Sequence, residues 1–198
     1  MIAPKPLCAV ALIAVPGMLY AQTTQNLSEM TEMPAHRTFV THSADAELAP
    51  FTTDGCSGGM SDVWAVTAAQ FPQWAESQGE VPPWQECCVT HDRAYHNAGG
   101  KKEATQSFKA RLKADEDLRS CVLAQGARDR ETLVIAYGIS EDTLDFFYGG
   151  IAQGMYFAVR LGGVPCSGLP WRWGYGFPNC SVLHRAWNGG ENDKQGTE

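Results

Sequence analysis

Two adjacent cysteines followed by a His-Asp pair, in segment 87–92, constrain this chain more than any other feature. On a helix, residues four apart lie on one stripe, so Cys87 shares a stripe with His91. Cys88 shares a second stripe with Asp92, about 100° away, which is the step between successive helical residues. Two disulfides leaving this helix would therefore hold one partner segment beside His91 and another beside Asp92. That arrangement can place a base next to a metal ligand.

The N-terminus predicts a secretory signal over residues 1–21. It contains Lys5, an apolar run from Leu7 to Val15 and a small residue at Ala21, where cleavage is expected. The alternative is a membrane anchor, but the apolar run is shorter than the ~20 residues needed to span a bilayer. Cleavage would leave 198 − 21 = 177 residues, enough for one domain with a sizeable core.

Cysteine count and charge then indicate the compartment and exclude some partners. Cleavage would remove Cys8 and Lys5, leaving 7 − 1 = 6 cysteines and a formal charge of −7 − 1 = −8. An even number of cysteines behind a secretory signal predicts an oxidised framework, and six cysteines allow 15 pairings. We expect a secreted or periplasmic protein. Its acidic balance argues against nucleic acid, and against capture by anionic lipid through charge alone.

Residues 22–50 are polar and lack clear periodicity, so we expect a polar leader or flexible arm with solvated His36 and His42. The globular domain then covers residues 51–198. Gly and Pro residues divide it into helices and an irregular tail. The expected helices are a short one over 62–71, one over Trp84–Asn97 that stops at Gly99-Gly100, a long one over Glu103–Gln125, and a third over Glu141–Leu161.

Particular residues support these helices. Phe108, Leu112, Leu118 and Val122 have helical spacing, and Ser140 can cap the third helix. Its small residues would permit close packing; they are Gly149, Gly150 and Gly154.

The motif resembles the helix signature of the secreted phospholipase A2 family, Cys-Cys-x-x-His-Asp-x-Cys-Tyr. Residues 87–95 match every position except one cysteine, which is Ala94 here. On the family's next long helix, a Cys-Asp pair is followed six residues after the Asp by another cysteine. Here Ala114-Asp115 is followed by Cys121. The family bonds the two missing cysteines to each other, so losing both together is what a true relative should show.

The resemblance covers about Asp54 to Cys121, roughly a third of the chain. The family's calcium loop usually reads Cys-Gly-x-Gly, whereas Cys56 is followed by Ser57-Gly58-Gly59. The family implies a mainly α fold: a disulfide-linked antiparallel helix pair with a Gly-rich calcium loop, plus an additional helix and an irregular C-terminal tail. The disulfides it implies are Cys56–Cys88 and Cys87–Cys121, leaving Cys166–Cys180.

The resemblance also implies roles for individual residues. His91 would be the general base that takes a proton from water, and Asp115 would accept the other imidazole N–H, as the Asp of a triad does. Tyr95 would hydrogen-bond Asp115. Asp117 is the alternative to Asp115, because it lies two residues away and either aspartate can face solvent.

Calcium is the implied cofactor, since it takes oxygen ligands that include backbone carbonyls. Asp92 would supply a carboxylate, and the loop would supply carbonyls near Gly55, Ser57 and Gly59. Asp54 and Asp62 flank the loop and could be extra ligands. Zinc is disfavoured, because neighbouring cysteines rarely bind one ion together and His91 is five residues from His96.

The function implied is a secreted, calcium-dependent phospholipase A2-like hydrolase that cleaves the sn-2 acyl ester of glycerophospholipids. Its partner would be phospholipid at a membrane or micelle surface, through peripheral contact. Two alternatives stay open: a catalytically silent module that binds a protein or lipid surface, and a hydrolase of another ester or amide. The aromatic segment 171–177 can pack in the core or form an interfacial patch, and core packing is favoured.

Overall fold

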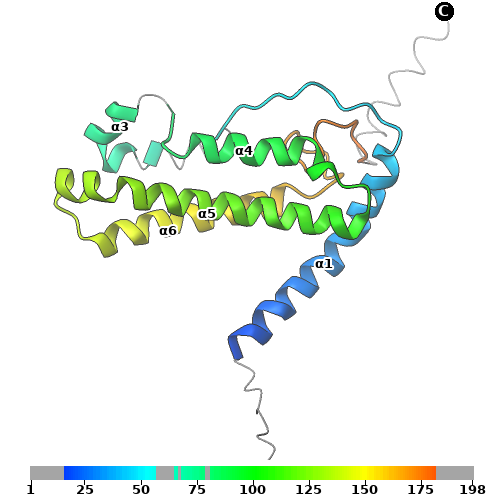
Figure 1. Cartoon of the computed structure of the whole chain (residues 1–198), viewed down its shortest axis with the longest axis horizontal. Helices are drawn as coiled ribbons and strands as arrows, with labels where there is room; N and C mark the ends of the chain where they lie inside the picture. The colour runs from blue at the N-terminus through cyan, green and yellow to red at the C-terminus, as the bar shows by residue number, and fades with distance from the viewer. Residues whose placement is uncertain (1–15, 57–64, 67, 79–80, 182–198) are drawn as a thin grey trace, which may run out of the picture.

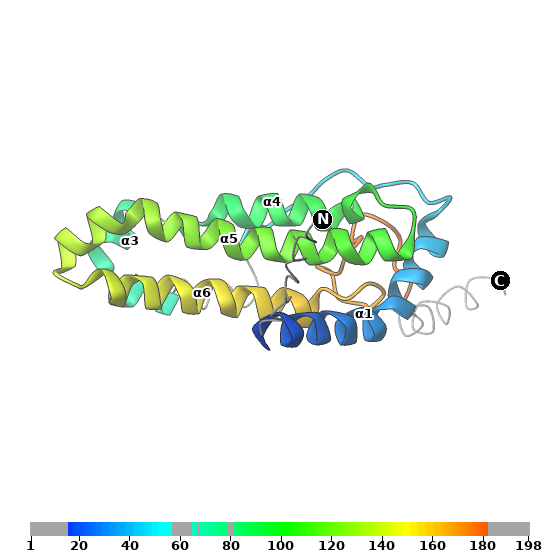
Figure 2. The same ribbon diagram turned by 60° about the horizontal axis from the view of Figure 1, so that its bottom comes forward.

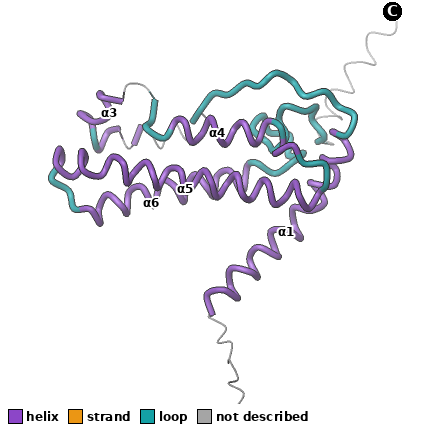
Figure 3. Tube along the Cα trace, in the orientation of Figure 1, coloured by secondary structure: helices purple, strands orange, loops and turns teal. Residues whose placement is uncertain are grey.

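The computed structural model describes residues 16–56, 65–66, 68–78 and 81–181. Within these ranges the protein is mainly helical and contains no strand (Figures 1 and 3). The helices are α1 (Pro16–Ser43), α3 (Pro72–Gln78), α4 (Gln85–His96), the 3-10 turn η1 (Ala98–Gly100), α5 (Ala104–Tyr137) and α6 (Glu141–Gly162).

The central pair is α5 and α6, joined by a short turn at residues 138–140. Gly138 ends α5 in the left-handed conformation at φ +61°, and its N–H donates to the carbonyl of Val134 at 2.9 Å. Ser140 begins α6 as predicted, since its hydroxyl accepts from the backbone N–H of Thr143 at 3.2 Å. The chain therefore reverses sharply, and α6 runs back along α5 (Figure 1).

Helix α5 is longer than predicted, because it continues past Gln125 to Tyr137. Gly126 does not end it. At Gly126 the ring of Tyr148 from α6 packs directly against the backbone of α5, and a Cβ there would collide with it. Three glycines in the middle of α6 were expected to permit close packing, and this was wrong. A Cβ would meet nothing within 4 Å at any of them, namely Gly149, Gly150 and Gly154.

Helix α4 lies antiparallel to α5 as expected, and two disulfides leave it. Cys87 bonds Cys121 with a Cα–Cα distance of 5.7 Å, and Cys88 bonds Cys56 with a Cα–Cα distance of 5.3 Å. The third pair, Cys166–Cys180, closes the C-terminal tail. The same cysteines are joined as the resemblance implied. Around the two disulfides of α4 lies the larger apolar core, which includes Trp84, Leu118, Val122 and Leu144.

The N-terminal segment differs from the expected arm. Residues 16–43 form α1, which contacts α5 and lies beside the C-terminal part of α6 (Figure 2). His36 was expected to be solvated, yet it is fully buried, and Phe39 is buried with it; only His42 is exposed as predicted. The buried stripe of this helix carries the polar residues Ser28 and Glu32, so hydrophobic periodicity does not reveal it. The signal peptide itself stays a prediction.

The aromatic tail completes a second, smaller core. Trp173 is fully buried, its ring meets that of Tyr95 edge-on at 5.0 Å, and its Nε1–H donates to Ser107 at 2.9 Å. Trp171, in contrast, is 55% exposed. Core packing is therefore the observed role of Trp173.

One further expectation falls partly outside the described residues. The short helix over 62–71 is seen only at 65–66 and 68–70, after which Pro72 begins α3, as proline at a first helical position often does. Among the described residues, no helix combines the length and apolarity needed to cross a membrane.

Candidate active site

The imidazole of His91 on α4 faces Asp115 on α5. His91 Nε2 lies 2.9 Å from Asp115 Oδ1, and the hydroxyl of Tyr95 donates to the same oxygen at 2.7 Å. A carboxylate only accepts hydrogen bonds, so Nε2 carries the proton in neutral His91 and the lone pair lies on Nδ1. The rings of His91 and Tyr95 lie 4.1 Å apart and fix the orientation of the imidazole.

The choice between Asp115 and Asp117 is resolved by burial. Asp115 is fully buried, whereas Asp117 is exposed and pairs with Lys113 at 2.7 Å on the surface of α5. The Cys87–Cys121 disulfide lies one turn before His91 on α4, so it holds the two helices together close to the His91–Asp115 contact. The three residues predicted to form the general base and its support, His91, Asp115 and Tyr95, thus lie together.

The negative charges of Asp115 and Asp92 favour the protonated form of the His91 imidazole. Burial alone lowers the pKa of His91, but Asp115 and Asp92 outweigh it and raise the pKa above its ordinary value. Burial, together with the charge of Asp115, raises the pKa of Tyr95 well above its ordinary value. Tyr95 therefore stays a neutral donor, and His91 is the group that gains a proton.

The other imidazole nitrogen faces Asp92. His91 Nδ1 lies 3.9 Å from Asp92 Oδ1, too far for a direct hydrogen bond. Asp92 Oδ2 accepts from the hydroxyl of Thr53 at 2.5 Å, and that hydroxyl oxygen accepts from the N–H of Gly55 at 2.9 Å. The start of the Gly-rich loop is therefore held on the Asp92 stripe, one turn beyond the Cys56–Cys88 disulfide.

Gly55 has a specific structural reason to be glycine. Its φ is +67°, and a Cβ would overlap the side chain of Gln85. Gln85 Oε1 in turn accepts from the N–H of Cys56 at 3.2 Å, which fixes the loop to the first turn of α4. The positive φ and the close contact with Gln85 therefore both favour glycine at this position.

Tyr175 of the tail contacts the segment that leads into the loop. Its hydroxyl donates to the carbonyl of Thr52 at 2.6 Å. Burial and the charges of Asp92 and Asp54 raise the pKa of Tyr175 to about 12, so both carboxylates lie near this ring. Among the predicted calcium ligands, Asp92 and Gly55 are joined through Thr53, whose hydroxyl donates to the Asp92 carboxylate and accepts from the Gly55 N–H. Ser57, Gly59 and the extra candidate Asp62 lie outside the described residues.

The oxygens shown at this place are the carboxylate of Asp92 and the hydroxyl of Thr53, and both are hard ligands of the kind that suits calcium. Asp92 keeps 21% of its side chain exposed, so it can be reached from solvent. In the described part of the chain, no three His, Cys, Asp or Glu side chains are grouped to hold a metal. The predicted calcium site differs from such a group, because it would consist of one carboxylate and carbonyls of the loop.

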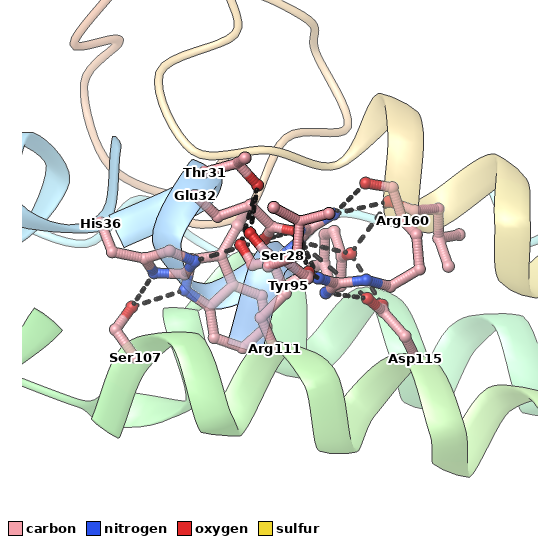
Figure 4. A network of polar contacts seen from close by, with 12 residues as sticks. Ser28, Thr31, Glu32, His36, Tyr95, Ser107, Arg111, Asp115 and Arg160 are labelled. Carbon is pink, nitrogen blue, oxygen red and sulfur yellow. Dashed lines mark hydrogen bonds and ion pairs between the residues drawn. The ribbon is translucent and has the colours of Figure 1, made fainter. Parts of the chain in front are cut away.

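A buried ionic network that was not predicted from the sequence lies behind Asp115 (Figure 4). Arg160 Nη1 donates to Asp115 Oδ2 at 3.0 Å, and Arg111 Nε donates to the hydroxyl of Tyr95 at 3.1 Å. Glu32 of α1 pairs with both arginines. The only sequence signal was that Arg111 lies four residues before Asp115 on α5. Nothing in the spacing of Glu32 and Arg160 indicates that they meet.

No protein-family model matches this sequence, and comparisons with curated proteins and with solved structures found no match either. The chemistry of the site therefore rests on its own geometry. A buried His-Asp pair with its free nitrogen turned toward a second, accessible carboxylate can hold a water molecule and remove a proton from it.

Proposed function

We propose that this protein is a secreted, calcium-dependent phospholipase A2-like hydrolase that cleaves the sn-2 acyl ester of glycerophospholipids. The observation that carries the proposal is the pairing of His91 Nε2 with Asp115 Oδ1 at 2.9 Å, with Nδ1 facing Asp92. The choice of substrate and of the sn-2 position comes from the resemblance of residues 87–95 and 115–121 to the family's motifs.

In the proposed reaction, the lone pair on His91 Nδ1 takes a proton from water as the water attacks the ester carbonyl. Asp115 stabilises the imidazolium that forms, and in the neutral ring it keeps Nε2 protonated so that the lone pair lies on Nδ1. His91 then returns the proton to the leaving alcohol. The direct attack of water needs no serine nucleophile.

Asp92 and the carbonyls of the loop at Gly55, Ser57 and Gly59 would hold the calcium ion. Bound there, calcium would polarise the ester carbonyl and offset the negative charge on its oxygen in the transition state. Thr53 holds Asp92 Oδ2 by a hydrogen bond, and the Cys56–Cys88 disulfide keeps the loop against α4. These contacts support a binding position beside, and separate from, the His91–Asp115 pair.

A specific observation favours the alternative of a catalytically silent module. The hydroxyl of Thr53 already bonds the carboxylate proposed as the calcium ligand, and the sequence after Cys56 departs from the family's loop. A module of this kind would keep the scaffold to bind a protein or lipid surface. The intact set of His91, Asp115 and Tyr95 favours the enzyme.

The proposal is tested with oxidised protein and a phosphatidylcholine that carries different fatty acids at sn-1 and sn-2. We expect release of the sn-2 acid in calcium, its loss with a chelator, and its return when calcium is restored. Release that is unaffected by chelation would remove calcium from the mechanism. Release of neither acid would favour the silent module, and hydrolysis only of simpler esters or amides would favour the third alternative.

A further inference from the structure

The carboxylate of Asp115 is held at both oxygens. Oδ1 accepts from His91 and Tyr95, and Oδ2 accepts from Arg160 Nη1 at 3.0 Å. The next donor to Oδ2 is Arg111 Nε, which is 4.0 Å away and bonds the hydroxyl of Tyr95 instead. Without Arg160, the carboxylate would lose the contact that holds its plane in the orientation that directs one oxygen at the imidazole.

Arg160 is itself held by the N-terminal helix. Its Nη2 donates to Ser28 at 2.9 Å and pairs with one oxygen of Glu32, whose other oxygen pairs with Arg111. Arg111 also donates to two carbonyls of α6, those of residues 159 and 160, at 2.9 and 2.7 Å. Figure 4 shows Glu32 between the two guanidinium groups. One side chain of α1 therefore connects the cations of α5 and α6.

The charges in this network balance only when α1 is docked. Arg111 is fully buried and Arg160 is 10% exposed, so two positive charges face the negative charges of Asp115 and Glu32. Burial raises the pKa of Glu32, but His36, both arginines and Ser28 outweigh it and lower the pKa to about 2, so Glu32 is ionised. Removing one member of such a set leaves an uncompensated buried charge.

His36 adds no charge to the network at neutral pH. Its Nδ1 lies 2.9 Å from the hydroxyl of Ser107, which accepts from Trp173 Nε1 at 2.9 Å. Since that hydroxyl accepts from tryptophan, its own proton is free to be donated to His36, whose remaining N–H then faces Glu32. Burial, together with the two arginines, lowers the pKa of His36. The helix therefore contributes one net negative charge here, from Glu32.

We propose that Arg160 is a positioning residue that orients Asp115 toward His91, and that Glu32 of α1 makes this possible by balancing the charges of Arg160 and Arg111. This inference rests on the proposed function. Helix α1, which was expected to lie outside the domain, then contributes to the site through the charge of Glu32. The residues act through Asp115 and touch neither substrate nor calcium.

The test uses the full chain with its disulfides intact, labelled with ¹⁵N-histidine, and four variants. Arg160→Met removes the guanidinium, Arg160→Lys keeps the charge, and Glu32→Gln removes the balancing charge. Lys113→Met is the matched control, because Lys113 is a cation of the same helix as Asp115 but is 73% exposed. The first readout is the NMR resonance of the His91 Nε2 proton, assigned by its absence in His91→Gln. The second is kcat and KM on micellar phospholipid.

We expect the Nε2 proton resonance in the parent, Lys113→Met and Arg160→Lys, and its loss or broadening in Arg160→Met and Glu32→Gln. Residues that orient a functional group through one contact typically change activity by about 10–100-fold. We therefore expect kcat to fall by that factor in Arg160→Met with KM within about twofold, and Arg160→Lys to recover most of it. Should Arg160→Met fail to fold, the isosteric Glu32→Gln carries the same two readouts.

A folded Arg160→Met with the parental resonance and kcat would overturn the inference while leaving the hydrolase proposal intact, and so would a parental Glu32→Gln. The experiment can also reject the hydrolase proposal while supporting the positioning role of Arg160. A parent that releases no fatty acid, yet loses its Nε2 proton resonance in Arg160→Met and not in Lys113→Met, would remove the proposed function and retain the positioning role.

Discussion

The two disulfides that leave adjacent positions of α4 should be nearly equal in stability and different in function. Cys56–Cys88 closes a separation of 32 residues and Cys87–Cys121 a separation of 34. Loop-closure entropy then gives about 3.7 and about 3.8 kcal/mol at 25 °C. We expect the double alanine variants of the two pairs to lose about 2–4 kcal/mol each, within about 0.5 kcal/mol of one another.

The functional losses should separate because the two bonds anchor different segments. Without Cys56–Cys88 the loop beside Asp92 is less ordered, and re-ordering one backbone residue costs about 1–2 kcal/mol. That is roughly a 5–30-fold loss of calcium affinity. Without Cys87–Cys121, α4 and α5 are less firmly held at the His91–Asp115 contact. We expect kcat to fall there, with calcium affinity within about twofold of the parent.

Each variant is the control for the other, because both lose one buried disulfide of similar span. The free energy of unfolding comes from urea titration, calcium affinity from calorimetry, and kcat from fatty-acid release at saturating calcium. Equal losses of calcium affinity in both variants would refute the assignment of one disulfide to the calcium loop and the other to the base. So would stability losses that differ by several kcal/mol.

Three further predictions concern single residues. Asp92→Asn removes the charged ligand and should weaken calcium binding on the order of tenfold or more by calorimetry; a parental titration would exclude Asp92 as a ligand. Gly126→Ala should lower the free energy of unfolding in urea by about 1–2 kcal/mol, because the added methyl collides with Tyr148. Gly150→Ala faces open space and should raise it by about 0.5–1 kcal/mol. The reverse order would refute the packing described. Because its pKa is lowered to about 2, ionised Glu32 contributes folding stability that is present above pH 4.5 and lost as the pH falls toward 2. We expect this contribution to be about 1–3 kcal/mol after allowance for partial solvation. The free energy of unfolding of Glu32→Gln should therefore depend less on pH over that range, and parallel profiles for variant and parent would contradict the prediction.

The arrangement of the cysteines, the histidine and the aspartate on α4 could be predicted from the sequence, because it depends only on residues that are close together in the chain. Cys87, Cys88, His91 and Asp92 lie within six residues, so helical spacing alone places them on two stripes. Ser140 marks the start of α6 for the same reason, since a cap acts within one turn. Local patterns of this kind carry directly into the structure.

The rest could not be predicted, because it depends on contacts between distant segments. Gly126 is unfavourable in a helix by propensity, yet α5 continues through it, and the missing side chain leaves room for the ring of Tyr148 from α6. Helix α1 looks unstructured because its buried stripe is polar. Glu32 becomes a core residue only when Arg111 and Arg160, from two other helices, are brought beside it.

The most direct measurement is the rate of fatty-acid release by His91→Gln, compared with the parent in saturating calcium and at matched thermal stability. A general base contributes about 10²–10⁴-fold, and glutamine can still donate to Asp115 but cannot take a proton from water. The account predicts a loss of that size with the helical circular dichroism unchanged. A folded His91→Gln protein that releases fatty acid at the parental rate would contradict it.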